Sequence, residues 1–191
     1  MINDEHKFIF IHVPKCGGVS MYKVFNTPKR QQGHSYLCEY ITNTNTNYFK
    51  FCFIRNPWDR FVSCYHYFKK YGRDGKGDVK MGAIVNRYDS FKDFTLGLDD
   101  IPESMMIYNH FDSQYKWFDN RLDFIGRFEH IQEDFDVVCE RVGIPQVKLP
   151  HRNKSKHTHY TDYYDDETRE IVAKRYSIDI EAFNYKFDED Q

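Results

Sequence analysis

Two short apolar runs, each followed at once by a turn and then by a helical pattern, constrain the fold of this chain most. Residues 7–13 read KFIFIHV and are followed by Pro14 and a glycine pair. Residues 49–54 read FKFCFI and are followed by the segment RNP at 55–57. Short runs rich in aromatic and β-branched residues, bounded by turn residues, indicate buried strands. The sequence therefore predicts two buried strands that each lead into a helix.

Further strands and helices are predicted along the chain. Residues 122–128, LDFIGRF, form a third strand candidate, and apolar residues recur at helical spacing from 57 to 70. Three more helices are expected at 20–26, 130–142 (closed by Gly143) and 165–176, and a surface loop at 72–82. Strands that alternate with helices favour an α/β fold with a central parallel sheet flanked by helices. A length of 191 residues fits a single domain, 1–191.

Charge and hydropathy exclude several classes of protein. The formal net charge of −2 argues against a general nucleic-acid binder, because such proteins carry a basic excess. The longest apolar runs fall far short of the roughly 18 residues that span a bilayer. The first residues, MINDEHK, are polar, and no apolar signal-peptide core follows them. We therefore expect a soluble globular protein with no nucleic-acid or membrane partner.

The cysteines and histidines indicate neither a disulfide framework nor a metal site. The five cysteines are an odd number, widely spaced and without a CxxC pair. Free thiols are typical of a reducing compartment, so a cytoplasmic location is expected. The histidines and acids show no HExxH or similar ligand spacing, so no metal is expected.

The turn after the first strand has the residues of an anion-binding loop. It reads PKCGGVS over residues 14–20 and lies between a strand and a helix. Adjacent glycines let the backbone approach a ligand closely, and a helix start offers unpaired N–H groups. Lys15 adds a positive charge and Ser20 a hydroxyl. These features favour phosphate binding, although an ordinary βα turn with a surface lysine remains the alternative.

A second basic residue follows the second strand. Arg55 closes that strand, and Ser63 lies eight residues further on, inside the following helix. Guanidinium and hydroxyl groups together can clamp a phosphate. Taken alone, the pattern favours a surface ion pair for Arg55 and a helix-face serine at Ser63 over a phosphate clamp. In a parallel sheet, however, both motifs lie at the carboxyl edge, and two anion sites there suit a nucleotide phosphorylated at two positions.

The two motifs together resemble the sulfotransferases that use 3′-phosphoadenosine 5′-phosphosulfate (PAPS), in particular the carbohydrate-type branch. PKCGGVS resembles the family's PKxGGTS, with Val19 in place of the usual threonine, and RNPWDRFVS resembles RNPxxRxxS. Later blocks at 123–135, 149–155, 159–172 and 179–185 follow in the family's order. The resemblance implies a P-loop-like sulfotransferase fold and sulfuryl transfer from PAPS to a hydroxyl acceptor, which for this branch is a carbohydrate.

The resemblance also implies roles for individual residues. The backbone amides of residues 16–20 and the Ser20 hydroxyl would bind the 5′-phosphosulfate, and Lys15 would neutralise the leaving oxygen. Arg55 and Ser63 would hold the 3′-phosphate, and Arg60 is expected near the same nucleotide. The members of the two nucleotide-binding segments are Lys15, Cys16, Gly17, Gly18, Val19 and Ser20, and Arg152, Asn153, Lys154 and Ser155.

The general base is predicted by position between the two motifs. His34, in the segment GHSYLCEY, is the first candidate, because the family has a histidine before a short helix in this region. Glu39 is the second candidate or a partner that orients His34. His66 is the third, with a helix-face role as its alternative, and His12 is expected to pack. His110 and Gln114 resemble a His-x-x-x-Gln block near the family's acceptor cleft.

Two other functions compete with sulfuryl transfer. The first is a small nucleotide kinase or phosphotransferase that uses the same loop. The absence of GxxxxGK, and of an evident magnesium-binding acid at a strand end, argues against it. The second is a non-catalytic module that binds a 3′-phosphonucleotide. The presence of Lys15 together with His34 favours catalysis over binding alone.

Overall fold

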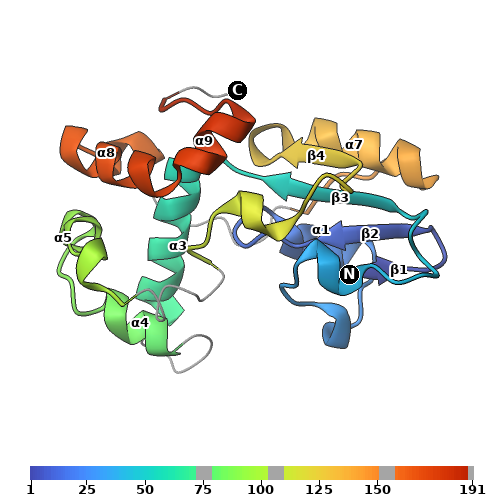
Figure 1. The fold of residues 1–191 in the computed structure, drawn as a ribbon, viewed down its shortest axis with the longest axis horizontal. Helices are drawn as coiled ribbons and strands as arrows, with labels where there is room; N and C mark the ends of the chain where they lie inside the picture. Colours follow the sequence, from blue (N-terminus) through green and yellow to red (C-terminus); the bar gives the residue numbers. More distant parts are fainter. Residues whose placement is uncertain (72–78, 103–109, 151–157, 189–191) are drawn as a thin grey trace. The chain divides into compact units, whose positions relative to one another are not determined.

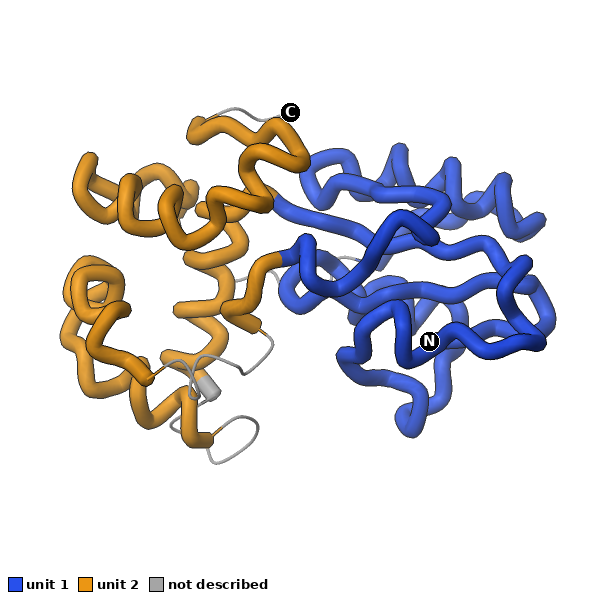
Figure 2. Tube along the Cα trace, viewed as in Figure 1, with its two compact units in different colours: residues 1–55, 114–153, 190–191 blue, residues 56–113, 154–189 orange. Residues whose placement is uncertain are grey.

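The computed structural model describes residues 1–71, 79–102, 110–150 and 158–188 (Figure 1). The chain forms two compact units, residues 1–55 with 114–153 and residues 56–113 with 154–189, apart from a short C-terminal stretch that groups with the first (Figure 2). The first unit contains the sheet, and the second is helical. The prediction of a single domain over 1–191 stays a prediction.

The sheet of the first unit has four strands in the order β1-β2-β3-β4: β1 (Ile2–Asn3), β2 (Phe8–Ile11), β3 (Phe49–Ile54) and β4 (Phe124–Arg127). Strands β2, β3 and β4 run parallel, with Ile11 opposite Cys52 and Ile54 opposite Arg127. Strand β1 pairs with β2 in the antiparallel direction, which was not predicted. The three predicted strands and the parallel sheet are therefore confirmed.

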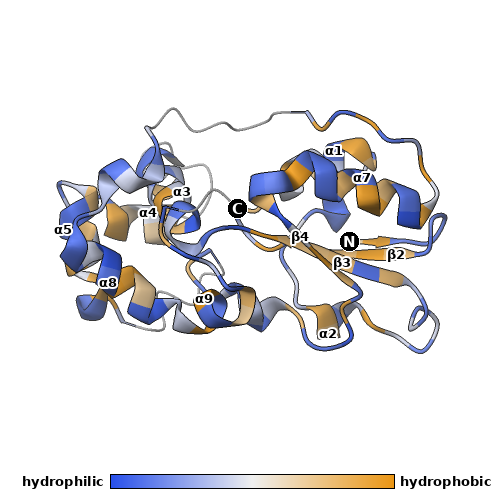
Figure 3. Ribbon diagram, turned by 90° about the horizontal axis from the view of Figure 1, so that it is seen from above, coloured by the Kyte–Doolittle hydropathy of each residue, from blue (hydrophilic) through white to orange (hydrophobic). Residues whose placement is uncertain are grey.

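Helices cover both faces of this sheet. Helices α1 (Gly18–Val24) and α7 (Ile131–Val142) lie on one face and the short helix α2 (Leu37–Tyr40) on the other (Figure 3). Three 3-10 turns complete the unit: η1 (Lys29–Gln31), η3 (Gln114–Trp117) and η4 (Phe128–His130). All four residues of β2 are buried, as are most of β3, because both faces are covered. The predicted α/β arrangement is confirmed.

Two glycines in the left-handed conformation set the boundaries of helices in this unit. Gly143 closes α7 in the left-handed conformation (φ 69°), as predicted. Helix α1 begins at Gly18, two residues earlier than predicted, because Gly17 also adopts a left-handed conformation and directs the chain into the helix at once.

The second unit contains five helices and two 3-10 turns among its described residues. These are α3 (Pro57–Tyr71), α4 (Val79–Val85), α5 (Phe91–Leu96), η2 (Leu98–Asp100), η5 (Tyr160–Tyr163), α8 (Asp166–Arg175) and α9 (Ser177–Phe183). The loop predicted at 72–82 is wrong for 79–82, which begin α4 with Met81 buried. Residues 72–78 lie outside the described part of the chain. The glycines of this segment had suggested a loop, but buried apolar residues on one side of α4 stabilise the helix despite its glycine.

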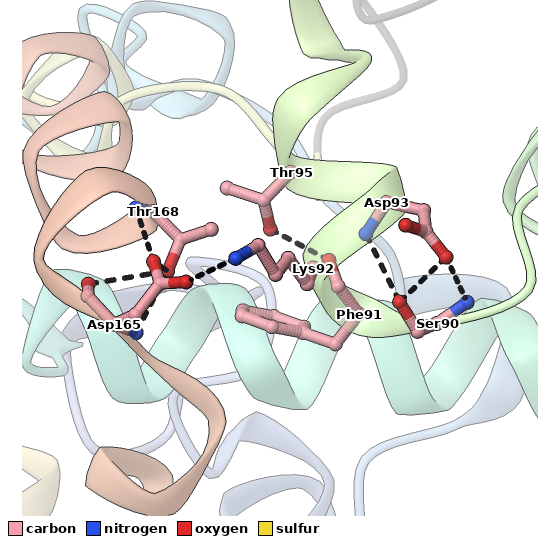
Figure 4. A network of polar contacts seen from close by, with 7 residues as sticks. All are labelled: Ser90, Phe91, Lys92, Asp93, Thr95, Asp165 and Thr168. Carbon is pink, nitrogen blue, oxygen red and sulfur yellow. Dashed lines mark hydrogen bonds and ion pairs between the residues drawn. The ribbon is translucent and has the colours of Figure 1, made fainter.

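Aromatic rings and capping groups hold the second unit together. Phe61 of α3 lies at the centre of a ring cluster with Phe94 and Phe111, at centroid distances of 5.8 and 5.5 Å. Asp165 caps α8 by accepting from the Thr168 N–H at 2.9 Å, and the Lys92 ammonium lies 2.7 Å from the same carboxylate (Figure 4). Most of the aromatic residues in this unit are therefore used for packing.

Candidate nucleotide-binding edge of the sheet

The turn between β2 and α1 has an unusual backbone conformation. Lys15 and Gly17 both have positive φ angles, 67° and 83°. A non-glycine residue rarely adopts this conformation, and such strain is concentrated at functional sites. Turns that alternate in this way direct successive N–H groups to one side and form anion-binding concavities. Two positive φ angles within three residues are compatible with such a concavity, and phosphate binding by the PKCGGVS turn stays a prediction.

The two glycines of this turn are required by their surroundings. A Cβ atom at Gly17 would overlap the Ile131 side chain of α7. A Cβ atom at Gly18 would overlap the imidazole ring of His12. The glycine pair therefore lets α1 pack closely against α7 and against His12, which follows β2.

Some of the groups of this turn that are predicted to bind the nucleotide already form hydrogen bonds within the protein. The N–H of Cys16 donates to the Val13 carbonyl at 3.4 Å, and that of Ser20 to the Gly17 carbonyl at 3.0 Å. The Ser20 hydroxyl donates to the Pro150 carbonyl at 2.8 Å. The first-turn amides of residues 17–19 are the ones that helix geometry leaves without an intrahelical acceptor. Phosphate contacts by Cys16 and Ser20 stay predictions that require these bonds to be exchanged.

Arg55, directly after β3, reaches the turn after β2. Its Nη1 donates to the Lys15 carbonyl at 3.2 Å, and its guanidinium lies 4.2 Å from the centroid of the Phe128 ring, which follows β4. Residues from three neighbouring strand ends thus meet at the carboxyl edge of the sheet. The side chain is 8% exposed, so the environment of its charge is largely built by the protein. A guanidinium has five N–H donors, of which the bond to the Lys15 carbonyl uses one, and the predicted contact of Arg55 with a phosphate stays a prediction.

Gln114 connects these two segments, a role that the sequence did not indicate. Its Oε1 accepts from the Arg55 N–H at 2.9 Å and from the Cys16 thiol at 3.3 Å. Its Nε2 donates to the Arg55 carbonyl at 2.8 Å, and the residue is fully buried. Gln114 was expected near an acceptor cleft through its resemblance to a family block. The structure shows that its amide fixes the end of β3 beside the first turn, and its place near an acceptor cleft stays a prediction.

The remainder of the second motif belongs to the helical unit. Ser63 is 5% exposed and lies in α3, so its predicted pairing with Arg55 joins two units and stays a prediction. Arg60 is fully buried, and its Nη2 donates to the carbonyls of His110 and Asp112 at 3.0 and 2.5 Å. The expectation that Arg60 lies near the nucleotide is therefore wrong, because its guanidinium hydrogen-bonds to the backbone of residues 110–112.

The base candidates differ in their surroundings. His34 is partly buried, and its Nδ1 lies 2.9 Å from the His12 carbonyl. Glu39 is exposed and accepts from the Tyr36 N–H at 3.2 Å, which makes it a capping residue of α2 rather than a partner of His34. His66 lies in α3, in the second unit, with its ring 5.1 Å from that of Tyr163. His34 and Glu39 share a unit with Lys15, whereas His66 does not, and the His34 ring lies 4.2 Å from that of His12.

Four further expectations concern the segment 152–155, a metal site, a membrane span and the cysteines. Arg152, Asn153, Lys154 and Ser155 lie outside the described residues. In the described ranges, no cluster of three or more potential metal ligands occurs. In the same ranges, no helix combines the length and the apolar character needed to cross a bilayer. All five cysteines, which fall within those ranges, are free thiols.

Comparison with known proteins identifies the family. The chain is 28% identical over 228 aligned positions to carbohydrate sulfotransferase 14 of Danio rerio, covering 97% of this chain and 61% of that protein. It is 24% identical to carbohydrate sulfotransferase 9 of Homo sapiens, covering 96% of this chain and 52% of that protein. An uncharacterised protein of Archaeoglobus fulgidus is 28% identical over 52% of this chain and 71% of its own length.

The matches to the two carbohydrate sulfotransferases cover nearly all of this chain but only part of each of those proteins. The chain spans only about six-tenths of the length of carbohydrate sulfotransferase 14. No solved structure gives a significant match. A family model described as "Sulfotransferase family" matches residues 1–186, which include both predicted motifs and both compact units. A match over nearly the whole chain shows membership. This chain belongs to the sulfotransferase family.

Proposed function

We propose that this protein transfers a sulfuryl group from PAPS to a hydroxyl group of a carbohydrate. Family membership supports the transfer of sulfate, and the names of the relatives support a carbohydrate acceptor. The observation that carries the proposal is the hydrogen bond from Arg55 to the Lys15 carbonyl, at 3.2 Å. It joins two basic residues, each predicted to hold one phosphate group, at one edge of the sheet.

The residues at this edge fit a doubly phosphorylated nucleotide. The strained turn of residues 15–17, with glycines that admit no Cβ, leaves the backbone as the surface offered to an anion. Lys15 and Arg55 each supply a positive charge, and the hydrogen bond from Arg55 to the Lys15 carbonyl holds the two residues together. A guanidinium suits a terminal phosphate because its fork of donors matches the phosphate oxygens. Ser63 and the segment 152–155 are proposed to complete the site.

Catalysis requires little covalent chemistry from the protein. PAPS supplies an activated sulfuryl group, whose transfer leaves negative charge on the 5′-phosphate. Lys15 is proposed to stabilise that charge by its ammonium group and by the neighbouring amides of residues 17–19. In-line transfer also needs an acceptor hydroxyl held in place and deprotonated as the new bond forms.

His34 is proposed as the base that removes the acceptor proton. Its Nδ1 faces the His12 carbonyl, which can only accept a hydrogen bond, so the neutral ring carries its proton on Nδ1. The lone pair of the neutral ring is therefore on Nε2. This tautomer is the one that a general base at Nε2 requires. A reducing, cytoplasmic location is a further part of the proposal, supported by the five free cysteines.

Ligand-induced stabilisation separates the proposal from its alternatives. The protein would be heated with adenosine 3′,5′-bisphosphate, adenosine 5′-monophosphate, or ATP with magnesium. At a bisphosphate concentration about 100 times Kd, we expect Tm to rise by about 5 to 10 °C, with a much smaller effect of the monophosphate. A preference for ATP with magnesium would instead favour a kinase and contradict the proposal.

Turnover then separates an enzyme from a binding module. Labelled PAPS would be incubated with the protein and a panel of glycans, and sulfated product would be counted. We expect transfer to at least one glycan. Binding of the bisphosphate without transfer to any hydroxyl acceptor would favour the non-catalytic module.

A further inference from the structure

A phenol and two imidazoles form a connected group beside the anion-binding turn. His12 lies at the end of β2, Tyr22 lies in α1, and His34 follows the loop after η1. The rings of His12 and His34 are 4.2 Å apart, and those of His12 and Tyr22 are 4.9 Å apart. All three residues belong to the first unit, and the motifs assigned above give Tyr22 no role.

The hydroxyl of Tyr22 makes three hydrogen-bond contacts whose directions can be assigned. It donates to the Gly33 carbonyl at 2.6 Å and accepts from the Gly33 N–H at 3.1 Å. The third contact is with Nδ1 of His12 at 3.0 Å. A tyrosine hydroxyl has a single proton, which is used by the Gly33 carbonyl. Nδ1 of His12 must therefore donate to Tyr22.

The state of Tyr22 supports this assignment. Its side chain is 4% exposed, and burial raises the pKa of the phenol to about 12. The hydroxyl therefore keeps its proton throughout the physiological pH range. With Nδ1 of neutral His12 protonated, the lone pair of that ring is on Nε2. The ring edge that carries Nε2 lies against Gly18, the residue at which α1 begins.

The same hydroxyl also fixes the backbone next to His34. It engages both the carbonyl and the N–H of Gly33, which directly precedes His34. His34 in turn bonds through Nδ1 to the His12 carbonyl, and its ring lies 5.9 Å from that of Trp117. Each imidazole is thus held through Nδ1, and Tyr22 contacts the first ring directly and the second through Gly33.

We propose that Tyr22 is a positioning residue that holds His12 in the Nδ1-protonated tautomer and, through Gly33, sets the location of the His34 ring. Tyr22 touches neither the proposed base nor the anion-binding turn with its hydroxyl, so it acts through the two histidines. The effect on turnover rests on the proposed function, whereas the effect on the tautomers does not.

The variant Tyr22→Phe tests the proposal because it removes only the hydroxyl. The imidazole nitrogens would be observed by ¹⁵N NMR at neutral pH, with His12 and His34 assigned by single substitutions to glutamine. In the unmodified protein, we expect both rings to show protonated Nδ1. In Tyr22→Phe, we expect His12 to lose this single tautomer and the His34 signals to shift. Unchanged nitrogen signals would overturn the proposal.

Turnover provides the second measurement. In Tyr22→Phe, we expect kcat to fall by about 10- to 100-fold, because small displacements of a reacting group have effects of this size. KM for PAPS should change by less than about threefold, since the turn is not altered. A loss confined to KM, or a fall in Tm large enough to leave unfolded protein at the assay temperature, would contradict a positioning role.

A matched control removes another tyrosine hydroxyl from the same unit. Tyr48 is 7% exposed, and its hydroxyl donates to Asp4 at 2.8 Å, outside the group described here. Tyr48→Phe should leave both the nitrogen signals and kcat unchanged. If the tautomers change as expected in Tyr22→Phe but the unmodified protein transfers no sulfate, the proposed function fails and the positioning role stands.

Discussion

The two strand–turn–helix segments use their basic residues differently. In the first unit, Lys15 lies in a strained turn, and Arg55 reaches that turn from the neighbouring strand end. In the second unit, Arg60 is fully buried and binds backbone carbonyls of residues 110–112. Lys15 and Arg55, each of which follows a strand, therefore meet at one edge of the sheet, whereas Arg60, inside α3, holds the backbone of residues 110–112.

This difference shows that the groups around a basic residue, and not its position in a motif, determine its role. A charged group can be buried only when hydrogen bonds replace its hydration, and Arg60 obtains them from carbonyl groups. Arg55 is nearly as buried, yet its guanidinium lies beside a strained turn and over the Phe128 ring. We therefore expect substitutions in the first segment to change ligand binding and turnover, and substitutions of Arg60 to change folding.

The largest expected effect is that of Lys15→Ala. Removing a charge that stabilises the leaving group should lower kcat by about 100- to 1,000-fold, or roughly 3–4 kcal/mol in the activation barrier. Adenosine 3′,5′-bisphosphate should still bind and raise Tm. The control is Lys23→Ala, an exposed lysine on helix α1, which follows the turn of Lys15, and this variant should keep full turnover. Turnover of Lys15→Ala equal to that of the unmodified protein would contradict the proposed role.

Arg60→Met should have the next largest effect, and on stability. It removes two hydrogen bonds from a charged donor and leaves the carbonyls of His110 and Asp112 without this partner. We expect a loss of about 2–4 kcal/mol in the free energy of unfolding, measured by urea denaturation. Arg87→Met, an exposed arginine of the same unit, should lose much less. Unchanged stability with weaker bisphosphate binding would return Arg60 to the nucleotide site.

Local patterns in the sequence predicted the elements that local physics determines. The run FKFCFI became β3 with its predicted bounds, and Pro57 begins α3 as expected of proline in a first helical turn. Asp165 and Gly143 cap their helices because their side chain or backbone freedom acts over a few residues. The two strand–turn–helix motifs therefore could be located, and their place at one sheet edge could be inferred.

The long-range polar contacts could not be predicted in this way. The partners of Gln114 lie 59 and 98 residues away in the chain, so no local spacing indicates them. The position of Tyr22 in its helix likewise looks like that of any core residue, because the contact of its hydroxyl with Gly33 depends on tertiary folding. The burial of Arg60 has the same cause, because charge alone favours a surface or ligand position.

Gly18→Ala probes how closely the first segment is packed. The added methyl group would overlap the His12 ring, so α1 or His12 must shift. We expect a loss of about 1–3 kcal/mol in the free energy of unfolding, together with weaker bisphosphate binding. The control is Gly33→Ala, where a Cβ meets nothing within 4 Å and which should be near neutral. Equal stability of the two variants would show that the helix start tolerates the shift.

The smallest expected effect concerns the exposed ion pair of the second unit (Figure 4). The hydrogen bond from Lys92, followed by those from the Thr168 N–H and hydroxyl, lowers the pKa of Asp165. A carboxyl with a lowered pKa stabilises the fold above its unfolded pKa, near 4, and loses that contribution as the pH falls further. Lys92→Met removes the largest of these causes, so we expect a slightly lower stability at pH 7 and a shallower loss of stability on going to pH 3, because less of the contribution remains to be lost.

Urea denaturation at both pH values would measure this effect, with Lys80→Met, another exposed lysine of the same unit, as the control. Both variants lose one positive charge, so a difference between them reports the contact with Asp165 rather than net charge. The effect must be small because both partners are exposed and solvent screens their attraction. A loss in Lys92→Met as large as that in Arg60→Met would contradict the view that burial, rather than charge itself, determines how strongly a basic residue of this unit supports the fold.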